Sequence, residues 1–215
     1  MLIFSPNMLK TFIDCPQKYI FKYDEKISVP QKASWFEKGK KVHALAHYYL
    51  RGDNISKLEP VLTQEERHIW ETLKANPYFQ KQYVNSEYNL SCKVGDFWIG
   101  GRLDALMQEN ESLYILDYKT GSVPKNPEQD FQTMVYLLCV SKIYPQAKEI
   151  KFVYIDLKNN KNHIVEFTEE LKILYEKAIT MTCDKIISLA LPEEIPYAKH
   201  CDFCEYGKIC HVNVF

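Results

Sequence analysis

Gly100-Gly101-Arg102-Leu103-Asp104, followed by Leu116-Asp117-Tyr118-Lys119, is the part of the sequence that decides the fold. Both stretches lie in apolar runs that predict strands over 97–107 and 112–119, with Glu109-Asn110-Glu111 as the turn between them. Alternate residues of a strand face the same side, so Asp117 and Lys119 should project together while Leu116 and Tyr118 turn towards the core. Two carboxylates on neighbouring strands predict a site for a hard divalent cation, Mg²⁺ or Mn²⁺, with the lysine amine beside it.

The rest of the chain predicts helices and strands that alternate around these two strands. Further strands are predicted over 84–93, 151–157 and 163–167. Helices are predicted from Ser5-Pro6 with a break at Cys15-Pro16, over about 33–50, from the capping-box pattern Thr63-Gln64-Glu65-Glu66, and over about 126–144 and 168–189. We therefore expect an α/β fold with a mixed central β-sheet flanked by helices. It should form one domain over 1–215, with a helical insertion at about 33–80.

Composition and charge limit the classes of protein to consider. The 215 residues carry a formal net charge of −1, so binding to nucleic acid would depend on a local positive patch or a bound metal. The longest apolar run, 134–140, is far too short to span a membrane, and the start of the chain lacks the pattern of a secretory signal peptide. We expect a cytoplasmic protein, whose seven cysteines then need a role other than disulfide formation.

Each candidate residue also has a purely structural interpretation. Asp104 can be satisfied by backbone N–H groups at a strand end, and Asp117 with Lys119 can form a structural ion pair. Glu87 is a further acid near the predicted metal site, but we interpret it as a surface residue. The candidates for contacts with DNA phosphates are Lys38, Lys40, Lys41 and Lys125. A solvated lysine face explains each of these four equally well.

Four motifs, taken in sequence order, carry a resemblance to a known family. They are Gly39-x-x-x-His43, Gly101-Arg102-x-Asp104, Asp117-x-Lys119 and Gln132-x-x-x-Tyr136. In this combination the chain resembles the PD-(D/E)XK nuclease superfamily. More narrowly it resembles the RecB-like branch, which includes nuclease domains of bacterial helicase–nucleases and CRISPR-associated exonucleases. Leu103 stands where the superfamily has a proline, and the second acid is Asp117 rather than glutamate; both differences fit that branch.

The resemblance implies a restriction-endonuclease-like core and a role for each motif residue. The metal ligands would be His43, Asp104, Asp117 and the backbone carbonyl of Tyr118. Lys119 would position the attacking water. Gln132 and Tyr136 would line the site next to the DNA, where Tyr136 is a candidate for stacking on a base. The implied function is a Mg²⁺- or Mn²⁺-dependent deoxyribonuclease that hydrolyses phosphodiester bonds, with exonuclease action on single-stranded or free ends as the expected mode.

Four of the cysteines form a second pattern at the two ends of the chain. Cys201-x-x-Cys204 and Cys210 lie in a cysteine-rich segment at about 190–215, and Cys15 precedes Pro16. Four thiolates can hold zinc or an iron–sulfur cluster. Because Cys-Pro followed by an aromatic residue resembles the iron–sulfur staple of AddB-type nucleases in the same branch, the resemblance implies a 4Fe–4S cluster, with zinc as the less favoured occupant. This cluster would join the N- and C-terminal segments. The other cysteines, Cys92, Cys139 and Cys183, are expected in the core.

The resemblance also implies a place in DNA repair and recombination or in CRISPR adaptation. The partners would be DNA together with a helicase or CRISPR adaptation proteins, and no membrane. Two other functions remain open. One is a non-catalytic DNA-binding or scaffold subunit that keeps the fold and the cluster. The other is a zinc-binding interaction protein in which the acids only pair with lysines.

Overall fold

A computed structural model describes residues 2–29, 37–188 and 199–210, and these residues form a six-stranded mixed sheet. The strands are β1 (Ile3–Phe4), β2 (Gln82–Val94), β3 (Phe97–Glu109), β4 (Ser112–Lys119), β5 (Glu149–Asp156) and β6 (Lys161–Glu166). Their order is β1-β3-β4-β5-β6, and β2 pairs with β3. The pairs β2–β3, β3–β4 and β5–β6 are antiparallel, whereas β1–β3 and β4–β5 are parallel. The expected mixed central sheet is confirmed.

The turns that join the antiparallel strands contain residues that adopt left-handed backbone at low cost. Gly95 (φ +56°) closes the β2–β3 hairpin, Asn110 (φ +54°) the β3–β4 hairpin and Asn160 (φ +51°) the β5–β6 hairpin. Glycine lacks a Cβ, and asparagine can hydrogen-bond locally, so both tolerate this conformation. All three turns lie between strands that the sequence predicts.

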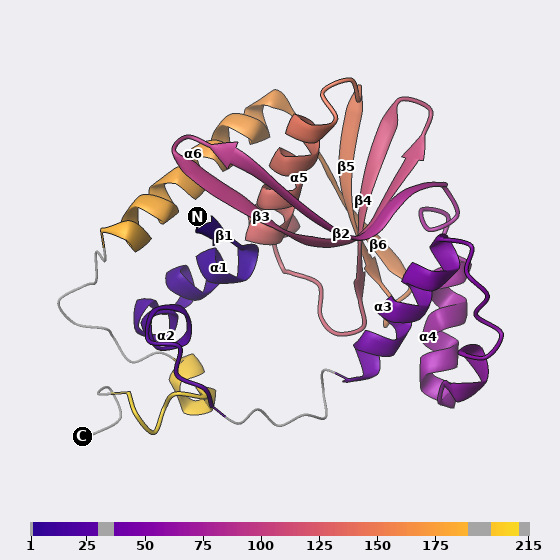
Figure 1. Cartoon of the computed structure of the whole chain (residues 1–215), viewed down its shortest axis with the longest axis horizontal. Coiled ribbons are helices and arrows are strands. Elements are labelled where there is room, and N and C mark those ends of the chain that lie inside the picture. Colours follow the sequence, from indigo (N-terminus) through magenta and orange to yellow (C-terminus); the bar gives the residue numbers. More distant parts are fainter. Residues whose placement is uncertain (1, 30–36, 189–198, 211–215) are drawn as a thin grey trace.

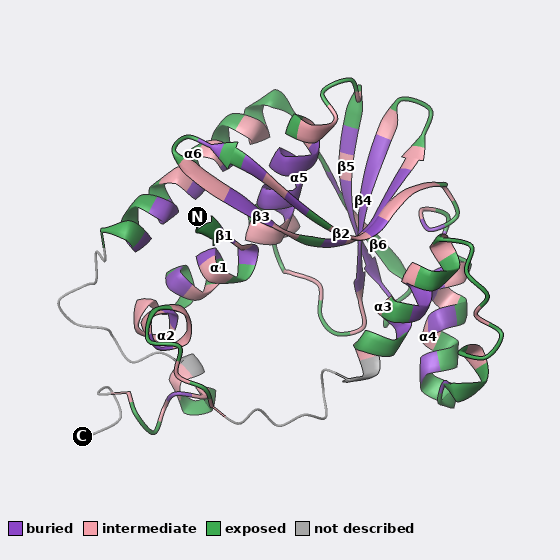
Figure 2. Ribbon diagram, in the orientation of Figure 1, coloured by how far each residue is buried: buried purple, intermediate pink, exposed green. Residues whose placement is uncertain are grey.

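Helices cover both faces of the sheet (Figure 1). The helices α1 (Pro6–Asp14), α5 (Phe131–Ile143) and α6 (Glu169–Ile187) lie on one face, and α3 (Glu37–Leu50) and α4 (Gln64–Lys74) on the other. Each face has its own buried core: Phe152 and Tyr154 of β5 pack on the α5 side, and Val153 and Ile155 on the α3 side. Figure 2 shows α5 and the central strands as the most buried elements. In the described residues, none of the helices combines the length and the apolar character needed to cross a membrane.

The N-terminal helices start and stop where the sequence predicts. The Ser5 hydroxyl caps α1 by accepting from Met8 N (3.3 Å), and the helix ends at Cys15 before α2 (Pro16–Tyr19) and a π-helical turn, Ile20–Asp24. After a 3₁₀ turn, Glu59–Val61, α4 opens with the predicted capping box. Its two hydrogen bonds are Glu66 N to Thr63 Oγ1 (3.2 Å) and Thr63 N to Glu66 Oε2 (2.8 Å).

One boundary differs from the prediction in a way that affects the site. The helix expected from about residue 126 begins at Phe131, after a separate 3₁₀ turn, Pro127–Gln129. The reason is Asp130, whose extended backbone stops the first turn and whose carboxylate accepts from Gln132 N (2.8 Å) to start α5. Gln132 therefore lies in the first turn of the helix, at its end nearest β4.

Candidate functional site

The site lies where β3 loses its strand partner along one edge. Strand β2 pairs along one edge of β3, and both β4 and β1 pair along its opposite edge. On that opposite edge, β4 pairs with residues 105–109 of β3, and β1 pairs with Trp98 and Ile99. Residues 100–104 between them have no strand partner on this side among the residues that the structure describes. Asp104 immediately precedes Ala105, the first residue of β3 that pairs with β4. The Asp104 Oδ2 accepts a hydrogen bond from Tyr118 N (2.9 Å). The Asp104 carboxylate thus takes the place of the backbone carbonyl that Tyr118 N would bond to if the β3–β4 pairing continued.

The backbone around Asp104 is irregular. Ile99 and Leu103 of β3 lie in the core on the α5 side, whereas Ala105 and Met107 lie in the core on the α3 side. A regular two-residue repeat would keep all four on one face. Because β3 changes faces here, side chains from both faces of the sheet can meet at this point.

His43 reaches the site from α3. Its Nδ1 lies 3.2 Å from Asp104 Oδ1, and its Nε2 lies 3.0 Å from the carbonyl oxygen of Tyr118. Burial alone would lower the pKa of His43, but the hydrogen bond and charge of Asp104, helped by the charge of Asp117 and the Tyr118 carbonyl, raise this pKa to about 9. In the absence of metal, therefore, the ring is an imidazolium that donates to both acceptors. The structure thus brings His43 together with the first acid.

Asp117, Lys119 and Gln132 form a closed group on the α5 side. Gln132 Nε2 donates to Asp117 Oδ1, and Gln132 Oε1 accepts from Lys119 Nζ (3.1 Å). Lys119 Nζ lies 2.9 Å from Asp117 Oδ2. Asp117 and Lys119 therefore project together, as the two-residue repeat of β4 predicts, while Leu116 and Tyr118 are buried on the opposite face.

The two carboxylates oppose each other electrostatically. Burial raises the pKa of Asp117 to about 6, and the charge of Asp104 adds to the rise, while Lys119 and His43 act against it. Asp117 is 4% exposed, and its Oδ2 lies 2.9 Å from Lys119 Nζ. The Asp104 carboxylate, the His43 imidazole and the Tyr118 carbonyl are donors that fit a hard divalent cation. Asp117 is not part of the described group of ligand atoms that lie within 4.8 Å of one another.

Glu87 belongs to this site, and its interpretation as a surface residue is wrong. One ligand atom each from His43, Glu87 and Asp104 lie within 4.8 Å of one another. Glu87 Oε2 is held by Arg102 Nε at 2.9 Å. Its backbone has φ +48°, which costs a non-glycine residue roughly 1–2 kcal/mol. The hairpin register places Glu87 opposite Asp104, between the pairs Ser86↔Ala105 and Tyr88↔Leu103. Counting residues from Asp104 back through the Gly95 turn would therefore have identified Glu87 in the sequence.

Tyr136 supports the unpaired stretch of β3 from α5. Its hydroxyl donates to the carbonyl oxygen of Arg102 (2.9 Å), and a Cβ on Gly101 would lie only 2.9 Å from that hydroxyl oxygen. Burial raises the pKa of Tyr136, so the hydroxyl stays protonated and remains a donor. The residue is 6% exposed, which leaves little ring surface for stacking on a base. The structure thus places Tyr136 behind the site rather than at its surface.

The lysines suggested for phosphate contacts fall into different settings. Lys41 pairs with Glu66 of α4 (3.2 Å), so its charge is engaged in helix packing. Lys40 lines a cavity of about 700 Å³ together with His43 and Asp104. Lys125 lies in the β4–α5 loop and lines a different cavity. The side chain of Lys38 lies outside the described residues.

The four terminal cysteines come from segments that pack together. The C-terminal segment, which includes a 3₁₀ turn at Lys199–Phe203, contacts the N-terminal helices: Tyr206 packs on Phe21 (5.5 Å between ring centres), and Glu205 pairs with Lys18 (3.5 Å). Burial raises the pKa of Cys15, and the neighbouring thiols of Cys204 and Cys201 contribute to the rise. Within the described residues, however, no three of the cysteine sulfurs lie within 4.8 Å of one another. The three other cysteines, Cys92, Cys139 and Cys183, are buried in the core, as predicted.

Comparison with known proteins agrees with the geometry. The chain is 22% identical over 206 residues to the CRISPR-associated exonuclease Cas4 of Francisella tularensis subsp. novicida, covering 95% of this chain and 92% of that protein. It is 27% identical over 161 residues to the RecBCD enzyme subunit RecB of Borreliella burgdorferi, covering 66% of this chain but only 13% of RecB. Among solved structures, a candidate exonuclease from Eubacterium rectale shares the fold, with a TM-score of 0.56 at 12% identity over 98% of this chain and 86% of that one.

The family model of the PD-(D/E)XK nuclease superfamily matches residues 3–211, which is nearly the whole chain. This match covers all four sequence motifs and the four terminal cysteines, Cys15, Cys201, Cys204 and Cys210. The chain belongs to the PD-(D/E)XK nuclease superfamily.

Proposed function

We propose that this protein is a divalent-metal-dependent deoxyribonuclease that hydrolyses phosphodiester bonds, acting as an exonuclease on single-stranded or free DNA ends. The observation that carries the proposal is the placing of Lys119, 2.9 Å from Asp117 and 3.1 Å from Gln132, beside the His43–Asp104 pair. A hydrolytic site of this superfamily requires an ammonium group next to acidic side chains, and here Lys119 contacts the Asp117 carboxylate beside the His43–Asp104 pair.

The residues proposed to hold the metal are His43, Asp104, Asp117 and the Tyr118 carbonyl, with Glu87 added on the strength of its position. When bound, Mg²⁺ or Mn²⁺ would supply positive charge that stabilises the phosphate and makes a neighbouring water more acidic.

The role proposed for the protein's own groups follows from their contacts. Gln132 holds both Asp117 and Lys119, which fixes the ammonium group in direction as well as in position. Lys119 is 27% exposed at its side chain, so it can reach a water and donate a hydrogen bond that orients it. Tyr136 keeps Arg102 and the neighbouring backbone in place without touching the substrate.

We propose further that Cys15, Cys201, Cys204 and Cys210 hold a 4Fe–4S cluster, with zinc as the less favoured occupant. The contacts between the two chain ends and the mutual influence of Cys15, Cys201 and Cys204 support this. A cluster there would tie the N-terminal helices to the C-terminal segment and would stabilise the fold.

The biological setting is also a proposal. The similarity to Cas4 and RecB supports a cytoplasmic role in CRISPR adaptation or in DNA repair and recombination, with CRISPR adaptation proteins or a helicase as partners. Between the two settings, the similarity to Cas4 over nearly the whole length of both proteins favours the first.

The test is degradation of end-labelled single- and double-stranded DNA in Mg²⁺ or Mn²⁺. Wild-type protein should shorten the labelled DNA strand from one end, and it should be inactive in EDTA. Lys119→Ala should lower the rate by about 10²-fold or more, the size expected for loss of a group that moves or orients a proton. The matched control is Lys177→Ala, which removes an exposed lysine of α6 and should cleave at the wild-type rate. Equal rates for Lys119→Ala and Lys177→Ala would refute the assigned role, and no cleavage by wild type would refute the function.

A further inference from the structure

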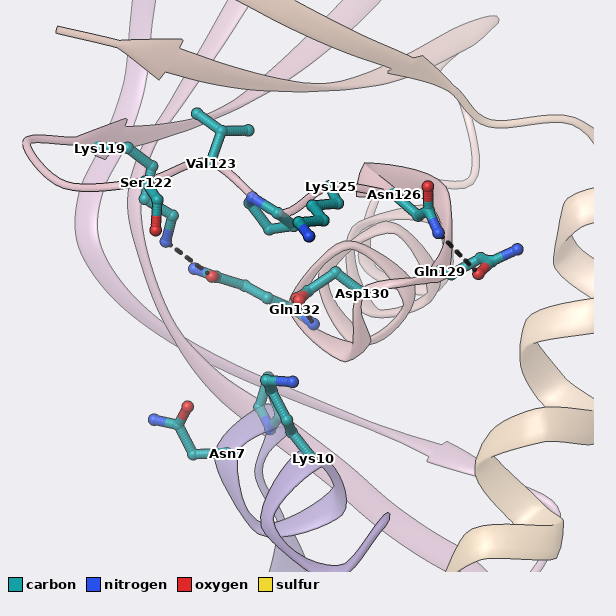
Figure 3. Close-up of a pocket in the computed structure, with 12 residues that line it drawn as sticks. Asn7, Lys10, Lys119, Ser122, Val123, Lys125, Asn126, Gln129, Asp130 and Gln132 are labelled. Atoms are coloured by element: carbon teal, nitrogen blue, oxygen red, sulfur yellow. Dashed lines mark hydrogen bonds between the residues drawn. The ribbon is translucent and has the colours of Figure 1, made fainter. Parts of the chain in front are cut away.

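A cavity that adjoins the candidate active site lies between α1 and the β4–α5 loop. Its volume is about 510 Å³, which is within the range of ligand sites. Figure 3 shows Asn7 and Lys10 of α1 on one side of the space, and Val123 and Lys125 of the loop on the other. Lys119 and Gln132, joined by their hydrogen bond, belong to both this cavity and the candidate active site. We call this cavity the lysine pocket, after Lys10, Lys119 and Lys125.

The lysine pocket carries an excess of positive charge. Three lysines face one acid, Asp130, whose carboxylate already caps α5. Lys125 forms no ion pair with any of the described residues. Lys10 pairs with Asp14 (3.1 Å), but both side chains are more than half exposed, so this pair holds the lysine only weakly. The pocket therefore offers two cations that a ligand can engage, in addition to Lys119.

The two neighbouring cavities differ in this respect. In the cavity that contains His43, two acids, Glu87 and Asp104, face the positive charges of Lys40, Arg102 and the His43 imidazolium. In the larger cavity of about 1050 Å³ behind the loop, Lys125 and Lys158 are matched by Glu65 and Asp156. Of these three cavities, the lysine pocket has the largest excess of positive over negative side chains.

We infer that the lysine pocket binds the backbone phosphate next to the one that is cut, on a single DNA strand that passes between α1 and the β4–α5 loop. The inference rests on the proposed function and names where its substrate lies. A chain of net charge −1 cannot hold DNA by overall attraction, so binding depends on a local positive site or on a bound metal, and the lysine pocket is such a positive site beside Lys119. The amides of Asn7 and Asn126 add donors for phosphate oxygens. Contacts of this kind position the strand and read no sequence.

Binding of fluorescein-labelled oligothymidylate, followed by anisotropy in EDTA over a range of NaCl concentrations, tests the inference without any cleavage. Each phosphate contact to a single strand makes the slope of log association constant against log salt concentration more negative by about 0.7. Relative to 1 M salt, one such contact therefore raises the affinity about fivefold at 0.1 M salt. Lys125→Ala should therefore weaken binding about fivefold, and Lys10→Ala with Lys125→Ala about 25-fold, with the slope reduced by about 1.4.

Lys177→Ala is again the matched control, because it removes one exposed lysine of α6. This part of α6 lies near the Gly95 turn of the β2–β3 hairpin and does not line the lysine pocket. It should bind with wild-type affinity and slope. Both pocket lysines are exposed, so neither variant should fold differently, and melting curves check this. If the wild type binds and cleaves DNA but Lys125→Ala binds as the control does, the pocket is not the phosphate site and the proposed function stands. If the wild type neither binds nor cleaves DNA, both proposals are overturned.

Discussion

Replacing Gly101 with alanine tests the packing that supports the site. The new Cβ would lie 2.9 Å from the hydroxyl oxygen of Tyr136 and 3.0 Å from its Cε1, closer than such atoms normally approach. The tyrosine is 6% exposed and packs against Phe152, so it cannot move aside freely. Overpacking of this kind costs about 1–3 kcal/mol in the free energy of unfolding.

Two smaller terms nearly cancel. Displacing Tyr136 breaks its hydrogen bond to the Arg102 carbonyl, which is worth about 1 kcal/mol. Alanine is more favourable than glycine within a strand by roughly 0.5–1 kcal/mol. The expected net loss for Gly101→Ala is therefore about 1–3 kcal/mol.

Urea unfolding followed by circular dichroism measures this loss. Gly121→Ala is the matched control, because a Cβ there meets nothing within 4 Å, and its stability should stay within about 0.5 kcal/mol of wild type. Tyr136→Phe removes both the hydrogen bond and the clashing oxygen. The double variant Gly101→Ala, Tyr136→Phe should therefore lose less than the sum of the single losses. A Gly101→Ala protein as stable as Gly121→Ala, or strictly additive losses, would contradict this view of the site.

Three further predictions concern the helices, the strained backbone and the cysteines. Thr63→Ala removes the capping-box hydrogen bond from Glu66 N and should cost about 1 kcal/mol in urea unfolding; no change would mean that the cap is not needed. Glu87→Gly relieves the positive φ and should leave the unfolding midpoint no lower than wild type, while weakening Mn²⁺ binding measured by calorimetry; unchanged binding would remove Glu87 from the site. Cys204→Ser should lower the melting temperature and abolish absorbance near ~400 nm in protein purified without oxygen, as loss of an iron–sulfur ligand requires; unchanged colour and stability would exclude the cluster.

Local sequence patterns predict most of this fold. The strands around Asp104 and Asp117 and the turns between them follow from apolar alternation and from Gly95, Asn110 and Asn160. The start of α5 was predicted too early, because proline at 127 opens only a short 3₁₀ turn and Asp130 caps the helix proper. Boundary errors of this kind arise where two capping signals compete within one turn.

The site could be predicted in part, and the missing parts depend on pairing between strands. The meeting of Asp117 with Lys119 follows from the period of one strand, and Gln132 lies beside them because α5 begins next to β4. Glu87 was interpreted as a surface residue because its place depends on the register of a hairpin and on an irregular backbone. The buried position of Tyr136 depends on the gap in the β3 edge, which only the complete sheet defines.

The most direct test of the central claim is calorimetric titration of the metal-free protein with Mn²⁺. We predict that wild-type protein binds the ion and that Asp104→Asn weakens its binding by at least about tenfold, since even a residue that only supports a ligand is worth that much. The asparagine oxygen can still accept from Tyr118 N, so the fold should be kept. Asp96→Asn is the matched control, because Asp96 has a 98% exposed side chain at the far end of the β2–β3 hairpin and should bind Mn²⁺ as wild type does. Wild-type protein that binds no Mn²⁺, or an Asp104→Asn variant that binds as tightly as Asp96→Asn, would contradict a metal site between these strands.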